Sequence, residues 1–172
     1  MPPSAVDQQT AKDLDTIARA VGLVVLQWGQ AEQSLDLLVA LLWQSFDGKR
    51  YAKKIPMMLE PKIKFVRTCM ESDAKLNAFQ VKSGVLLSKF SELSSLRHDM
   101  IHGAVTSIST IDDSFVFAKL DIRDGFHYHR EVRVSASEYP KIVDRLVELG
   151  RLAHELTSEV FVLVKDDDSF LK

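Results

Sequence analysis

The C-terminal part of the chain carries the pattern that most restricts its fold: seven apolar residues separated alternately by four and three positions. They are Ile142, Leu146, Leu149, Ala153, Leu156, Val160 and Leu163. Because an α-helix turns once in about 3.6 residues, this spacing places all of these side chains on one face. The pattern predicts a long amphipathic helix from Ser137 whose apolar face must be buried. Ser135 and Glu138 resemble a capping box at its start.

Similar three-and-four spacing runs from residue 11 to residue 46, at Leu14, Ile17, Val21, Val24, Trp28, Leu35, Leu38, Leu42 and Phe46. It predicts a second long helix, or a short helix followed by a long one if Gly22 breaks it. The pair Asp47-Gly48 predicts the end of this stretch. Two further helices are expected: a short one from Pro61 to about Met70, and a longer one capped by Asp73 and ended by Gly103.

After Gly103 the pattern changes to short β-prone runs over residues 104–110, 115–122 and 127–134. The pairs Asp112-Asp113 and Asp124-Gly125 separate them, which predicts a three-stranded antiparallel β-meander. The sequence therefore predicts a mainly α fold: a helical bundle, residues 11–164, with the meander (about 104–134) inserted before the C-terminal helix. Residues 1–10 and 165–172 are expected to be a flexible N-terminus and a flexible tail.

Composition limits the class of protein. The 172 residues are close to one domain, and 22 Lys and Arg against 24 Asp and Glu give a net charge of −2, so any contact with nucleic acid must be local. The single cysteine, Cys69, excludes a disulfide within the chain and is expected in the core. The longest apolar run, residues 37–43, is too short to span a membrane, so a cytoplasmic protein is expected.

One segment is strongly basic. Residues 49–67 hold seven Lys and Arg residues and one acidic residue, Glu60, so the net charge of the segment is 7 − 1 = +6. The segment is either a solvated loop or a groove that guides an RNA backbone. In the second case the RNA contacts are expected at Lys49, Arg50, Lys53, Lys54, Lys62 and Lys64, and Tyr51 and Phe65 could stack on bases.

Four ionisable residues, Arg97, His98, Asp99 and His102, occupy six positions near the predicted end of the helix before Gly103. An arginine beside the apolar stripe needs a carboxylate partner or an anionic ligand. The helix dipole is expected to raise the pKa of His102 and to hold it near neutrality. On a straight helix Arg97 and His102 lie about 140° apart, so they converge only if the helix distorts or a second chain contributes.

A purely structural reading stays open. In it Arg97 pairs with Glu32 or Asp99, and the histidines merely finish an exposed helix end. His127 and His129 share one face of a predicted strand and could seat a metal, but no third ligand is evident, so a surface strand is predicted. We therefore expect neither a metal nor a cofactor.

Arg97, four intervening residues and His102 resemble the Arg-x4-6-His motif of the HEPN superfamily. In that motif a polar residue often follows the arginine and a glycine the histidine; here Gly103 follows His102, and His98 rather than the frequent asparagine follows Arg97. The preceding helix, with Trp28, Glu32 and Leu35, is also similar to a pattern in these proteins. The resemblance covers roughly residues 11–103 and the last helix, and the meander departs from the simplest HEPN bundle.

The resemblance implies a metal-independent RNA endonuclease that acts as a homodimer, as a prokaryotic toxin or defence effector with an antitoxin protein as partner. His102 would take a proton from a ribose 2′-hydroxyl while Arg97 stabilises the phosphate, and the product would be a cyclic phosphate. His98, Asp99 and Glu32 would support them. The alternative is a noncatalytic module of the same fold that dimerises or binds a nucleotide or a partner protein.

Overall fold

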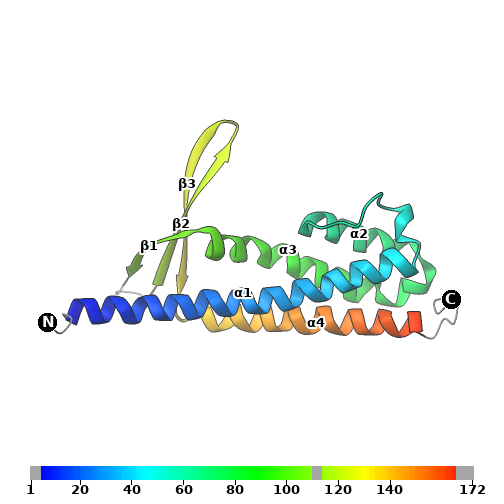
Figure 1. Cartoon of the computed structure of the whole chain (residues 1–172), viewed down its shortest axis with the longest axis horizontal. Coiled ribbons are helices and arrows are strands. Elements are labelled where there is room, and N and C mark those ends of the chain that lie inside the picture. Colours follow the sequence, from blue (N-terminus) through cyan, green and yellow to red (C-terminus); the bar gives the residue numbers. More distant parts are fainter. Residues whose placement is uncertain (1–4, 110–113, 166–172) are drawn as a thin grey trace. The chain divides into compact units, whose positions relative to one another are not determined.

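The computed structural model describes residues 5–109 and 114–165 (Figure 1). The elements, in chain order, are α1 (Ala5–Ser45), η1 (Gly48–Arg50), α2 (Leu59–Ser72), η2 (Ala74–Phe79), α3 (Gln80–His102), β1 (Ala104–Ser109), β2 (Ser114–Arg123), β3 (Phe126–Ser135) and α4 (Tyr139–Lys165). This confirms the predicted fold class: mainly helical, with a three-stranded antiparallel sheet before the C-terminal helix.

The chain divides into two compact units. Unit 1 comprises Met1–Gln27 and Ser94–Leu146, and unit 2 comprises Trp28–Leu93 and Val147–Lys172. The long helices α1, α3 and α4 each contribute residues to both units. No helix within the described ranges is both long and apolar enough to cross a membrane.

Helix α1 is uninterrupted, so the break considered at Gly22 does not occur. It also begins at Ala5, earlier than the predicted start near residue 11. Ile17, Ala20 and Val24 are buried on either side of Gly22 and continue the apolar stripe past it. Their burial outweighs the cost of about 1 kcal/mol for a glycine inside a helix.

The predicted end of α1 at Asp47-Gly48 is confirmed, and close packing explains it. Asp47 adopts a left-handed conformation with φ 51°. A Cβ atom at Gly48 would lie 2.6 Å from the Leu42 carbonyl oxygen and 2.8 Å from Cζ of Phe65. Only glycine therefore lets the chain turn this closely past the end of α1.

In unit 2, the stripe predicted for α4 is buried at Leu149, Ala153, Leu156 and Val160. The Thr157 hydroxyl donates to the Ser34 carbonyl oxygen of α1 at 2.9 Å, which fixes how these two helix segments align. Trp28 and Phe90 meet edge to face with ring centroids 5.6 Å apart. The apolar stripes of α1, α3 and α4 thus form the core of this unit.

In unit 1, the strands pair in the order β1-β2-β3, with β2 and β3 in continuous register from Ser114↔Ser135 to Arg123↔Phe126. Asp124 and Gly125, with φ 51° and 79°, form the tight turn that their sequence predicts. The expected turn at Asp112-Asp113 lies outside the described residues, as do residues 1–4 and 166–172.

The capping box predicted at the start of α4 is confirmed. The Glu138 amide donates to Ser135 Oγ at 3.2 Å, and the Ser135 amide donates to Glu138 Oε2 at 3.3 Å.

The close contacts around Gly48 lead to a prediction about stability. Gly48→Ala should lower the free energy of unfolding by about 1–3 kcal/mol, because the new methyl group overlaps backbone atoms that cannot move independently. Gly84→Ala is the matched control: Gly84 lies within α3 with no atom near its would-be Cβ, so it should be stabilising by about 0.5–1 kcal/mol. Urea denaturation of both variants measures this. Equal effects would contradict the packing argument.

Candidate functional site

The four ionisable residues near the end of α3 differ in their surroundings. Asp99 is buried, Arg97 is half-buried with a buried Nε atom, and His98 and His102 are exposed. The last turn of α3 therefore presents two imidazoles to solvent over a buried carboxylate. These residues and the sheet that follows them all belong to unit 1.

Gly103 ends α3 as predicted, but for a different reason from the one expected. Its φ is not positive, so it is not a left-handed helix cap. A Cβ atom here would lie 2.4 Å from the Asp99 carbonyl oxygen and 3.0 Å from Cβ of Phe117. The missing side chain thus allows β2 to pass directly against the end of α3, which brings the charged side chains of the sheet to the site.

A chain of alternating charges links the sheet to the helix. Arg130 on β3 forms an ion pair with the buried Asp99, and its Nε lies 3.5 Å from Asp121 Oδ2. Lys119 Nζ lies 2.9 Å from the other carboxylate oxygen of Asp121. Lys119 and Arg130 are direct cross-strand partners, an unfavourable pair of like charges that Asp121 offsets.

Sequence reasoning missed Lys119, Asp121 and Arg130. The signal that could have found them is the Asp124-Gly125 turn, because counting back from it gives the register that sets Lys119 opposite Arg130.

The two histidines are in contact. The ring centroids of His98 and His102 lie 4.6 Å apart with the ring planes at 51°. They are four residues apart on a regular helix and so share one face, whereas Arg97 and His102 remain about 140° apart. The helix distortion considered above is therefore absent, and the structure brings His98, rather than Arg97, against His102.

His98 is poised to act as a base. Desolvation lowers the pKa of His98 from its usual value, and the positive charges of Lys119 and His102 lower it further. Asp99 opposes this shift, and Arg97 adds a small contribution in the lowering direction. At neutral pH the His98 ring is therefore uncharged and can accept a proton.

Glu32 and Lys62 belong to a different environment in unit 2. Trp28 Nε1 donates to Glu32 Oε2 at 2.9 Å, and Lys62 Nζ lies 3.3 Å from Glu32 Oε1 and 2.5 Å from Asp36 Oδ1. Lys62 is only 4% exposed. Because its ammonium group is buried between two carboxylates, we correct the prediction that it contacts RNA. Glu32 therefore pairs with Trp28 and Lys62.

The other predicted RNA contacts are exposed, namely Lys49, Arg50, Lys53, Lys54 and Lys64. The predicted stacking ring of Phe65 is instead buried, with its centroid 6.0 Å from that of Trp43. Tyr51 is half-buried. The basic segment therefore offers cations to a ligand, but Phe65 cannot stack on a base.

The low pKa of His98 gives a prediction for NMR. In a titration of the histidine ring protons, His98 should have a pKa below 6.5, the model value for histidine. Lys119→Met should raise it, since removing a nearby positive charge favours the protonated ring. Lys141→Met, at an exposed lysine of α4 in the same unit, is the control and should leave it unchanged.

The same shift sets how stability depends on pH. The unfolded chain binds a proton at position 98 more readily than the folded one, so this residue makes the folded state less stable as pH falls through the usual histidine range. His98→Gln should weaken that pH dependence. An unchanged dependence, or a His98 pKa above the usual value, would contradict the environment described here.

Within the described ranges, no group of three or more His, Cys, Asp or Glu side chains could hold a metal ion. Burial, with a smaller contribution from Asp73, raises the pKa of Cys69 to about 12, so its thiol is a core group rather than a nucleophile.

The chain matches no family model, no curated protein and no solved structure. Its function must be inferred from the chemistry of the cluster at the end of α3.

Proposed function

We propose that the protein is a metal-independent RNA endonuclease of HEPN type whose active site is the cluster at the end of α3. The observation that supports this is the contact between His98 and His102, with the positive charge of Lys119 close enough to lower the pKa of His98. Paired imidazoles beside cations are suited to moving protons around a phosphodiester. The Arg97-x4-His102 resemblance adds to this argument.

The histidine pair can supply both a base and an acid. The contact between the rings places one imidazole where it could accept a proton and the other where it could donate one. We assign the base to His98 instead of His102, because desolvation and nearby positive charges lower the pKa of His98. Its neutral imidazole accepts the proton of a ribose 2′-hydroxyl as the oxygen attacks phosphorus. The imidazolium of His102 donates a proton to the 5′-oxygen as the P–O5′ bond breaks. The products are a 2′,3′-cyclic phosphate and a 5′-hydroxyl.

The cations would stabilise the charge that develops on the phosphate. Arg97 can present paired N–H donors to two phosphate oxygens, and Lys119 adds a second positive charge. Asp99 and Asp121 would otherwise repel the substrate, but both are engaged with Arg130. Because imidazoles move the protons and cations balance the charge, the proposed reaction needs no metal.

A second copy of the chain would complete the site. Because α3 is regular, Arg97 and His102 of one chain point in different directions. A twofold axis beside the end of α3 would bring Arg97 of one chain to the histidine pair of the other. We therefore include a homodimer in the proposal, together with a cytoplasmic role as a toxin or defence effector that an antitoxin protein restrains.

The first test is cleavage of single-stranded RNA in the presence of a chelator. His98→Ala, His102→Ala and Arg97→Ala should each lower the rate by at least about 100-fold, the usual contribution of one acid, base or charge-stabilising group. His154→Ala, at an exposed histidine of α4, is the control and should retain activity. Circular dichroism should show the same helical content in all four variants.

The chemistry of attack is tested on the substrate. An oligonucleotide with a 2′-deoxyribose at the cleavage position should resist cleavage, and the ribose substrate should give a 2′,3′-cyclic phosphate. Activity that requires added magnesium, or full activity in a folded His98 or His102 variant, would exclude this mechanism. It would leave the noncatalytic binding module as the better interpretation.

The shared site is tested by mixing inactive subunits. Arg97→Ala and His102→Ala chains, unfolded and refolded together, should recover about a quarter of wild-type activity. The reason is that half of the dimers are mixed and each mixed dimer retains one of two sites. Light scattering should give about twice the chain mass. A mixture that stays inactive, or a monomer at high concentration, would contradict a site divided in this way.

A further inference from the structure

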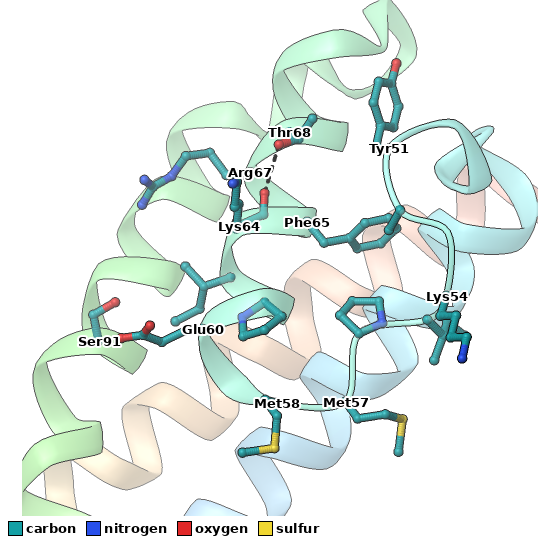
Figure 2. A pocket seen from close by; sticks show the side chains of 15 residues that line it. Tyr51, Lys54, Met57, Met58, Glu60, Lys64, Phe65, Arg67, Thr68 and Ser91 are labelled. Atoms are coloured by element: carbon teal, nitrogen blue, oxygen red, sulfur yellow. Dashed lines mark hydrogen bonds between the residues drawn. The ribbon is translucent and has the colours of Figure 1, made fainter.

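A broad groove lies in unit 2, and none of the residues used above for catalysis lines it. It has a volume of about 1150 Å³ and is lined by the 51–58 loop, the first turns of α2 and Ser91 of α3 (Figure 2). In Figure 2, Lys54 lies on one side of the groove and Arg67 on the other, with Met57 and Met58 close together at one end. The groove therefore combines exposed apolar side chains with a basic rim.

The apolar surface of the groove is unusually open to water. Met57 and Met58 are 75% and 72% exposed, and Ile55 is 38% exposed. Neighbouring exposed apolar side chains are a mark of binding surfaces, and methionine adapts its shape to different apolar partners. Pro56 lies within this loop and Pro61 in the first turn of α2, and each restricts the backbone at its position.

The rim of the groove carries unneutralised positive charge. Lys54, Lys64 and Arg67 are exposed and form no ion pair with another described residue, whereas Glu60 is the one acidic residue among those lining the groove. The net charge of the lining is therefore 3 − 1 = +2. Lys62 of the same segment shows the contrast, because two carboxylates of this chain already hold it.

These features favour a peptide over RNA. Single-stranded RNA binds by stacking its bases on exposed aromatic rings, but Phe65 is buried and Tyr51 is half-buried. Thioether and aliphatic side chains instead receive the apolar residues of an amphipathic segment. We propose that this groove binds an acidic amphipathic peptide segment of a partner protein. Its apolar residues would pack on Met57, Met58 and Ile55, and its carboxylates would pair with the basic rim.

The test starts from a displayed library of random peptides selected against the intact protein. Selected sequences should combine Asp or Glu residues with aliphatic residues. Their affinity, measured by fluorescence polarisation with the synthetic peptides, should fall at least about tenfold for two double variants: Met57→Ser/Met58→Ser and Lys64→Glu/Arg67→Glu. All of these side chains are exposed, so the variants should fold, which circular dichroism would check.

Two matched controls separate the groove from general effects. Leu37→Ser removes an apolar side chain that is 56% exposed on α1, and Lys49→Glu/Lys53→Glu reverses two charges of the basic segment that do not line the groove. Peptide affinity should change less than about twofold in both controls.

Two results would overturn the proposal. One is a selection that yields no acidic, apolar sequences, or sequences whose binding ignores both groove variants. The other concerns a single-stranded RNA oligonucleotide measured with the same proteins: if Lys64→Glu/Arg67→Glu abolishes RNA binding while no peptide depends on the groove, the surface is a nucleic-acid contact. Neither readout uses cleavage, so the outcome is independent of the proposed ribonuclease activity.

Discussion

Burial of the long apolar stripes is the constraint on which the rest of the structure depends. Leu149, Ala153 and Leu156 of α4 are completely buried, which fixes the rotation of that helix about its axis in unit 2. The hydrogen bond from Thr157 to Ser34 then fixes its alignment with α1. Polar groups in this core are tolerated only with partners, as Lys62 is between Glu32 and Asp36.

Local rules predicted most of the fold from the sequence. Helical spacing, the Asp124-Gly125 turn and the Ser135–Glu138 capping box depend on neighbouring residues, and each is present. Gly22 misled the prediction because its small local cost is overridden by packing of the flanking stripe, which a single sequence does not reveal. The burial of Lys62 has the same cause, since its partners lie about 30 residues away in the chain.

The candidate site could be predicted only in part. The crowding of Arg97, His98 and His102 was visible, and the spacing of four already places the two histidines on one face. The turn at Asp124-Gly125 could have paired Lys119 with Arg130, but it could not place them at the site, because that depends on how closely the sheet approaches the helix end at Gly103. The overall charge of −2 likewise conceals the basic rim of the groove in unit 2.

The ion pair between Asp99 and Arg130 has a consequence for the motion of the last turn of α3. Helix ends normally fray, but unwinding this turn would separate a buried carboxylate from its partner and open the close contact at Gly103. The turn that carries both imidazoles is therefore held in place before any ligand arrives. A ligand bound there would lose little affinity to ordering the protein, because the entropy cost of that order has already been met during folding.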